Sequence, residues 1–353
     1  MRALHIFTFA IAIFLSIDAL PYDKPKVHTI PLKPKSITRR RLSRRAMGSM
    51  PVSEQQPDVA YYGQITFGTG TPQNFDIQFD TGTGDLFVLV KFPIDGKNFS
   101  VEYADDTDVS GDSGKTTIVI AGISVEAQEF GLADKVSDDF KHPYEGVMGM
   151  GFSDLSDNEQ TTPITNLINN NQLDKPQFSF MLGREADKSS SELTIGGSNP
   201  DGYHADTLTF THLVDKNGGA WEIPIDNCVV DGKELNLEGH TGIIDIGTTR
   251  IILPPDDADE FYSKIDNAVD NGDGSYTLPC GDTYEVSLVF SGKTWSIDPR
   301  DFIVEINEDD CIGVVVYADT GSFTEWHIGS AFLRNVYTVF DQGNRQVGFA
   351  QLA

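Results

Sequence analysis

Two stretches of the chain repeat the pattern Asp-x-Gly-Thr, and each places a lone acid where an apolar run ends. Asp80 follows Phe75, Ile77 and Phe79, and Asp245 follows two isoleucines. Two carboxylates held at hydrogen-bond distance cannot both ionise easily, so such a pair keeps one proton. It can then take a proton from water while giving one to a carbonyl oxygen. The repeat therefore predicts general acid–base hydrolysis of a peptide bond by Asp80 and Asp245, without a covalent intermediate.

The residues that follow each acid suit this chemistry. A glycine lets the backbone turn tightly and bring its N–H groups close to the carboxylate. A threonine hydroxyl can hold the outer carboxylate oxygen. These residues are Gly82, Thr83, Gly247 and Thr248.

Each Asp-x-Gly-Thr stretch has a later partner, V-M-G at 147–149 for the first and H-I-G at 327–329 for the second. The alternation of Phe75, Ile77 and Phe79 with polar residues is typical of a half-buried strand. Two lobes, each with an Asp turn and a later apolar-apolar-Gly strand, are expected of a duplicated all-β unit. The length of 353 residues fits two domains or one large bilobal domain.

The N-terminal part of the chain differs from the rest. Residues 1–19 combine an early arginine, an apolar run and a small residue near the end, as in a secretory signal peptide, and cleavage after Ala19 is expected. Residues 21–50 hold nine Lys or Arg and one acid, whereas residues 51–353 hold 16 basic and 51 acidic residues. We interpret residues 20–46 as a basic propeptide clamped by charge onto an acidic body and released in acid. A disordered basic linker is the alternative.

The acidic body argues against nucleic acid and anionic membranes as partners. No Cys/His spacing indicates a metal site, and no cofactor is expected. Cys280 and Cys311 both lie in strand-like stretches and are the favoured disulfide of an exported protein, whereas Cys228 is typical of a buried thiol. Asn98 begins an Asn-Phe-Ser glycosylation sequon.

Ordered motifs along nearly the whole chain resemble the pepsin-type aspartic proteases, and fungal secreted members above all. The matching stretches include Y-Y-G-Q-I-T-F-G-T-G-T-P-Q-N-F, F-D-T-G-T, G-V-M-G-M-G-F, P-Q-F-S-F-M-L, L-T-I-G-G-S-N-P and F-L-R-N-V-Y-T-V-F-D. The resemblance implies an all-β bilobal fold of two barrel-like lobes with a cleft between them. It places the N-terminal lobe at 57–205 and the C-terminal lobe at 206–353.

The same resemblance implies a secreted zymogen whose active form is a monomeric endopeptidase that cuts polypeptides at acid pH. Asp80 and Asp245 match the catalytic pair, and Tyr103 matches the tyrosine of the flap, a hairpin that closes over substrate. Cys280 and Cys311 match the disulfide of the C-terminal lobe. A leader lysine would occupy the cleft of the zymogen, so that the propeptide inhibits its own enzyme. Asp105, two residues after Tyr103, matches an Asp associated with accepting Lys on the acyl side of the cut bond; a solvated loop tip is the alternative.

The sequence departs from the family pattern close to the expected site. Ile246 stands where the family has Thr or Ser, whose hydroxyl bonds across the lobe interface, so half of a reciprocal grip is missing. Further departures are Phe87 for the usual Trp, Ala104-Asp105-Asp106 for the flap glycines, His327 at an apolar position and Ser330 for the usual Asp.

These departures leave a second function open, namely a catalytically impaired homologue that binds peptides or proteins without cutting them. A carbohydrate-active enzyme with paired acids is a third reading. It needs carboxyl groups roughly 5–9 Å apart, whereas two symmetric Asp-x-Gly-Thr loops imply closer contact.

Overall fold

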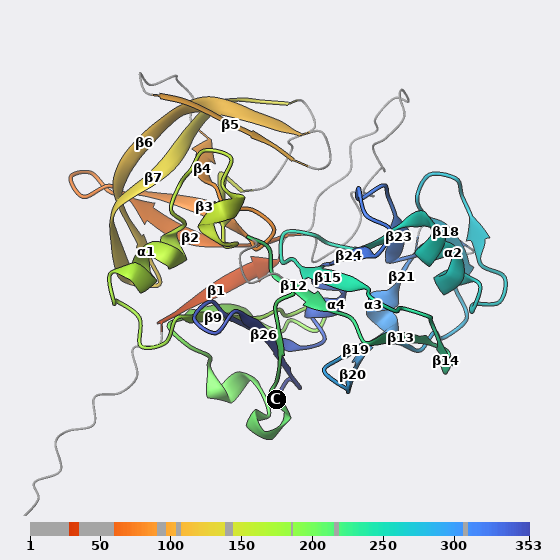
Figure 1. Cartoon of the computed structure of the whole chain (residues 1–353). Coiled ribbons are helices and arrows are strands. Elements are labelled where there is room, and N and C mark those ends of the chain that lie inside the picture. The colour runs from red at the N-terminus through yellow and green to blue at the C-terminus, as the bar shows by residue number, and fades with distance from the viewer. Residues whose placement is uncertain are drawn as a thin grey trace, which may run out of the picture.

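The computed structural model describes residues 28–34, 60–89, 97–103, 107–137, 144–184, 186–214, 219–305 and 310–353. Strands dominate these residues, and they gather into two lobes that lie side by side (Figure 1). No helix among these residues is long and apolar enough to cross a membrane. The all-β bilobal prediction is confirmed.

The N-terminal lobe is built from seven strands that form one run of the largest sheet, in the order β2-β3-β8-β4-β7-β6-β5. Their bounds are β2 (Tyr61–Phe67), β3 (Gln73–Asp80), β4 (Leu86–Leu89), β5 (Lys97–Glu102), β6 (Asp108–Ile120), β7 (Ile123–Val136) and β8 (Gly146–Gly149). Helix α1 (Pro163–Asn169) begins where Thr162 caps it, because the Thr162 side chain accepts a hydrogen bond from the Thr165 N–H and Pro163 fits the first turn.

The C-terminal lobe contains three smaller sheets, ordered β12-β15-β24-β16-β23, β14-β13-β19-β20 and β17-β18-β22-β21. The first consists of β12 (Glu222–Pro224), β15 (Thr241–Ile244), β24 (Glu325–Ile328), β16 (Ile251–Leu253) and β23 (Val315–Tyr317). The other two consist of β13 (Asn227–Val230), β14 (Lys233–Glu234), β17 (Val269–Asp270), β18 (Tyr276–Pro279), β19 (Val286–Phe290), β20 (Lys293–Ile297), β21 (Ile303–Glu305) and β22 (Asp310–Gly313). Helices α2 (Pro255–Tyr262), α3 (Pro299–Phe302) and α4 (Ser330–Leu333) complete the lobe.

The predicted duplication is visible in the strand pairing. In the N-terminal lobe β3 runs parallel to β8, β8 antiparallel to β4, and β4 parallel to β7. In the C-terminal lobe β15, β24, β16 and β23 repeat this sequence of parallel, antiparallel and parallel pairs. The two Asp-x-Gly-Thr stretches follow the matching strands β3 and β15, so the fold gives both acids the same setting.

A central layer joins the lobes, in the order β11-β26-β25-β9-β10-β1. It consists of β1 (His28–Pro34), β9 (Gln177–Met181), β10 (Ser191–Ile195), β11 (Thr209–His212), β25 (Tyr337–Asp341) and β26 (Gln346–Ala350). Phe178 of β9 stacks on Phe340 of β25 at 4.9 Å, and Trp221 packs edge-on against both rings. Strands from both ends of the chain therefore build the layer between the lobes.

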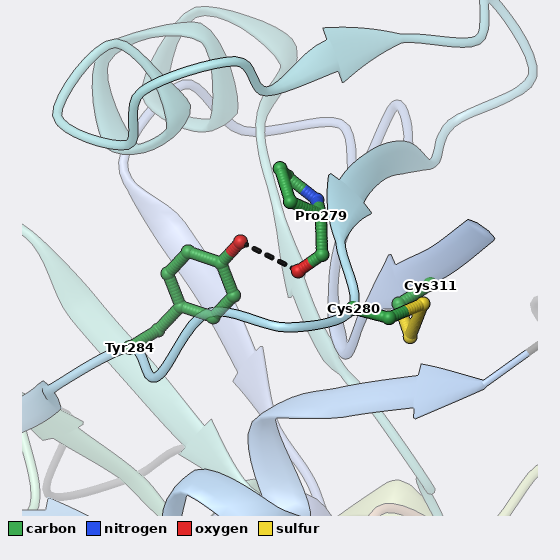
Figure 2. Close-up of a disulfide and its surroundings, with 4 residues drawn as sticks. All are labelled: Pro279, Cys280, Tyr284 and Cys311. Carbon is green, nitrogen blue, oxygen red and sulfur yellow. Dashed lines mark hydrogen bonds between the residues drawn. A yellow bond between two sulfur atoms is a disulfide. The ribbon is translucent and has the colours of Figure 1, made fainter. Parts of the chain in front are cut away.

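The predicted disulfide between Cys280 and Cys311 is present, with a Cα–Cα distance of 5.1 Å (Figure 2). It ties the end of β18 to β22, and beside it the Tyr284 hydroxyl donates to the Pro279 carbonyl at 2.9 Å. Cys228 is a free, buried thiol, and burial raises its pKa. Asn98 is exposed on β5, where its glycosylation stays a prediction.

Candidate active site

Asp80 and Asp245 meet at the interface of the two lobes, with each carboxylate against the glycine of the opposite loop. A Cβ added to Gly82 would lie 2.9 Å from Asp245 Cγ, and one added to Gly247 would lie 2.5 Å from Asp80 Cγ. Carbon atoms do not approach so closely without a clash. Glycine at both positions is therefore what allows the two loops to close on the pair.

The two carboxyl groups form one proton-sharing unit. Asp80 is 8% exposed and Asp245 is 7% exposed, so both carboxyl groups are buried side by side. The pKa of Asp80 is raised well above its ordinary value, first by burial and then by the charge of Asp245. The Gly82 N–H donates to Asp80 Oδ1 at 2.8 Å and partly opposes this shift. The pair therefore keeps a proton on Asp80 at a pH where an ordinary aspartate is ionised.

Asp245 accepts hydrogen bonds from both a backbone N–H and a threonine hydroxyl of its own loop. The Gly247 N–H donates to Asp245 Oδ1 at 2.8 Å, and the Thr248 hydroxyl donates to Oδ2 at 2.6 Å, as the sequence predicted. Thr83 differs from its counterpart Thr248. Its backbone N–H bonds Asp80, while its buried hydroxyl has no hydrogen-bond partner among the described residues. A threonine hydroxyl therefore donates to the carboxylate of Asp245 but not to that of Asp80.

The threonine next to Asp80 grips the opposite lobe. The Thr81 hydroxyl donates to the Ile244 carbonyl at 2.9 Å and accepts from the Ile246 N–H at 2.9 Å. Ile246, at the matching place beside Asp245, is 3% exposed and has no hydroxyl. Only one half of a reciprocal grip is built.

Trp221 supplies a second connection between the surroundings of Asp80 and those of Asp245, which sequence reasoning missed. Its indole N–H donates to the Met150 carbonyl at 3.0 Å, and the Met150 N–H donates to the Asp80 carbonyl at 2.7 Å. On the other side, the Ile244 N–H donates to the Trp221 carbonyl at 3.0 Å. Together with the Thr81 bond to Ile244, these contacts close a ring of hydrogen bonds that crosses the lobe interface twice. Nothing in the sequence around this tryptophan indicated its partner 71 residues away.

The flap hairpin is formed by β5 and β6, and Tyr103 follows β5. Tyr103 is half-buried and packs against a hydrophobic cluster that contains Phe87, Phe99 and Val101. The Tyr103 N–H donates to the Thr107 carbonyl at 2.9 Å. Residues 104–106, with Asp105 among them, lie outside the described residues. Phe87 fills the place of the family's tryptophan with a buried ring that carries no donor.

A buried carboxylate anchors the flap to the first catalytic loop, and this contact was also missed. Asp85 is 2% exposed and accepts hydrogen bonds from the Ser156 hydroxyl, the Asp157 N–H and the Asn158 amide, at 2.8, 2.9 and 3.1 Å. Asn158 in turn pairs with the backbone N–H and carbonyl of Ser100 in β5. The position of Asp85, five residues after Asp80, was the only available sequence signal.

A cavity of about 820 Å³ opens beside the flap hairpin. Tyr103 lines it together with the three acids Glu102, Asp108 and Asp157. Burial and the nearby charge of Asp85 raise the pKa of Asp157. The surroundings of the flap are therefore acidic.

The two remaining departures lie beside the second catalytic loop. The Ser330 N–H donates to the Thr248 carbonyl at 2.8 Å, and its hydroxyl donates to the Thr249 carbonyl at 3.3 Å, so Ser330 helps to fix this loop. His327 lies on β24 opposite Ile243 of β15.

The comparisons with known proteins agree with this geometry. A family model described as eukaryotic aspartyl protease matches residues 90–352. Rhizopuspepsin of Rhizopus chinensis is 30% identical over 330 residues, which cover 87% of this chain and 82% of the relative. An aspartic protease of Phaffia rhodozyma is 30% identical over 366 residues, or 96% and 86% of the two chains.

A probable aspartic-type endopeptidase CTSD of Arthroderma benhamiae is 36% identical over 249 residues, which cover 69% of this chain and 47% of the relative. The family model spans most of the chain, and two of these fungal relatives span nearly all of it. Together they determine the family. The chain belongs to the eukaryotic aspartyl proteases, the pepsin family.

Proposed function

We propose that the protein is an acid endopeptidase in which Asp80 and Asp245 activate water against a peptide bond. The observation that supports the proposal is the buried carboxyl pair, in which burial and the charge of Asp245 raise the pKa of Asp80. Asp245 takes a proton from the water as its oxygen attacks the carbonyl carbon, and Asp80 gives its proton to the carbonyl oxygen. The tetrahedral intermediate collapses when the C–N bond breaks: the leaving amine takes the proton from Asp245, and one hydroxyl of the intermediate returns a proton to Asp80, which restores the pair.

We also propose that the protein is exported and made as a zymogen, with residues 1–19 as signal peptide and 20–46 as propeptide. Strand β1 supports the second part, because it pairs with β10 in the central layer and with the start of β2. A leader held in this way can keep the cleft closed to substrate until acid weakens the attraction between its lysines and the acidic body.

The test starts from residues 20–353, taken from pH 7 to about pH 3.5 while leader loss and casein cleavage are followed. Asp80→Asn and the inhibitor pepstatin serve as controls. Leader loss and cleavage that both controls abolish would support the endopeptidase. A folded protein that cuts nothing from pH 2 to 7, even after another protease has removed the leader, would overturn it.

The second candidate is a peptide-binding protein without turnover. It is favoured by Ile246, which lacks the cross-lobe hydroxyl, and by the unpaired hydroxyl of Thr83. Peptide binding without cleavage in the same assay would support this function.

Asp105 gives the endopeptidase a proposed preference for lysine on the acyl side of the cut bond, since ionised carboxylates attract a cation near the scissile bond. The acidic cavity beside Tyr103 adds to this field. We expect Asp105→Ser to lower the ratio of cleavage after Lys to cleavage after Leu. An unchanged ratio would show that Asp105 does not determine the preference for lysine.

A further inference from the structure

One row of side chains crosses four strands of the five-stranded sheet in the C-terminal lobe, close to Asp245. In strand register, Glu222 of β12 lies opposite Ile243, Ile243 opposite His327, and His327 opposite Ile252 of β16. Ile243 precedes Asp245 by two residues, and side chains two apart on a strand share a face. The Asp245 N–H continues the pairing by donating to the Ile328 carbonyl at 3.0 Å. The row therefore lies on the face of the sheet that Asp245 shares, next to the carboxyl pair.

The matching row in the N-terminal lobe has a different character. There Gln78, two residues before Asp80, lies opposite Val147, and Val147 lies opposite Phe87. Val147 is 3% exposed and belongs to the apolar cluster under Tyr103. The duplication thus makes Val147 the counterpart of His327. The N-terminal lobe carries a covered aliphatic side chain at this position, and the C-terminal lobe carries an imidazole whose side chain is 28% exposed.

Glu325 is placed to orient this imidazole. It lies two residues earlier on β24, on the same face, and its Oε1 is 3.6 Å from His327 Nε2. The other ring nitrogen, Nδ1, has no hydrogen-bond partner among the described residues. The aliphatic side chains of Ile243 and Ile252 lie on either side. Glu325, Glu222 and Asp245 are the acids that face the row, and no lysine or arginine lies in it.

We infer that His327 determines specificity, and that the row forms a subsite for a substrate side chain with a carboxyl or carboxamide oxygen, namely Asp, Asn, Glu or Gln. In acid a histidine ordinarily carries N–H groups on both nitrogens. Glu325 forms an ion pair with the Nε2 side at 3.6 Å, and the N–H on Nδ1 needs an acceptor when substrate covers the row. An aliphatic substrate residue leaves that donor buried and unpaired, which is costly, whereas an amide or carboxyl oxygen satisfies it. This inference rests on the proposed peptide-binding cleft.

The experiment uses peptides that are identical except at one position on either side of the cut bond, where Leu is exchanged for Asn, Asp, Gln or Glu. Cleavage is measured with the mature enzyme at about pH 4. The ratio of kcat/KM for Asn to that for Leu is expected to fall about tenfold in His327→Ile at one substrate position, in line with the loss of one charge-assisted hydrogen bond. His212→Ile is the matched control, because His212 is exposed on β11 and pairs in register with Gln346 of β26, not with a residue of the row.

Affinity for the same peptides is also measured with Asp80→Asn protein, which does not depend on turnover. One outcome separates the two proposals. The wild-type protein cuts no peptide, the Asp80→Asn protein binds Asn peptides more tightly than Leu peptides, and His327→Ile removes this difference. The subsite is then supported and the endopeptidase is contradicted. Cleavage with the same ratio in wild type, His327→Ile and His212→Ile would overturn the subsite and leave the endopeptidase standing. Glu325→Gln should keep part of the preference, since a carboxamide can still orient the ring.

Discussion

Thr81 and Ile246 occupy matching positions beside the two central aspartates, and only Thr81 carries a hydroxyl. That hydroxyl makes two hydrogen bonds of 2.9 Å to the opposite loop. Ile246 contributes a buried aliphatic side chain instead. By the duplication, the groups that a hydroxyl at 246 would reach are the Phe79 carbonyl and the Thr81 N–H. At the scale of single residues, the pair is therefore held firmly from one side only.

We expect Ile246→Thr to raise kcat about three- to tenfold with little change in KM, because a second grip of about 0.5–1.5 kcal/mol would restrict the carboxylates to the reactive geometry. Steady-state kinetics on one peptide measure this. Ile265→Thr, at a buried site after α2, is the control for a hydroxyl placed in the same lobe. A folded Ile246→Thr enzyme with lower kcat would contradict the explanation.

The proton held by Asp80 predicts how stability depends on pH. Its pKa in the folded protein is raised, so the folded state binds this proton more tightly than the unfolded chain. The resulting stabilisation is complete below about pH 3.9, the ordinary aspartate value, and is lost as the pH rises through the raised pKa. Asp80→Asn has no such proton to lose. We expect the Tm of Asp80→Asn to rise relative to that of wild type between pH 4 and 7; a constant difference would show that the pair does not bind a proton more tightly on folding.

Among the elements, Trp221 links β15 to the segment that follows β8. Its indole N–H bonds the Met150 carbonyl, and its ring packs on Phe152 at 4.6 Å. Trp221→Phe keeps an aromatic ring but leaves the Met150 carbonyl buried without this donor. We expect the free energy of unfolding to fall by about 1–3 kcal/mol and kcat to fall as well.

Trp295 provides the matched control for this substitution. It is also buried, but its indole N–H has no partner among the described residues. Trp295→Phe should therefore change stability less and leave kcat unaltered. Equal effects of the two substitutions on kcat would show that the Trp221 hydrogen bond does not position the catalytic loops.

The elements also show what the sequence could and could not predict. The alternation of Phe75, Ile77 and Phe79 predicted β3, and the repeated Asp-x-Gly-Thr predicted the duplicated lobes, because both signals are local patterns. The Cys280–Cys311 pair was predicted because few cysteines compete. Two sets of hydrogen bonds were not predicted: those through Trp221 that cross the lobe interface, and those from Asp85 and Asn158 to β5. Both join segments far apart in the sequence and use residue types that are common elsewhere. The pairing of His327 with Ile243 could not be predicted, because it depends on the register between β15 and β24.

At the scale of the whole molecule, strand β1, which belongs to the basic N-terminal segment, pairs with β10 and β2 of the acidic body. Salt screens attraction between opposite charges, with a Debye length of about 10 Å at 0.1 M and about 3 Å at 1 M. We expect high salt at neutral pH to speed hydrogen exchange at those amides of β10 that pair with β1. Amides shared by β9 and β25 serve as the internal control. Exchange of β10 that does not respond to salt would mean that hydrogen bonds and packing, not charge, hold the leader.

The central layer has a consequence for how the protein is made. Strand β9 has β25 as its partner on one side, and Phe178 stacks on Phe340 there. While the ribosome is still adding the second half of the chain, this edge of β9 and its aromatic rings have nothing to pair with. An unpaired apolar edge invites pairing with other chains. A nascent or truncated chain that stops before Tyr337 would therefore meet chaperones and quality control as an unfinished protein, however complete its first lobe is.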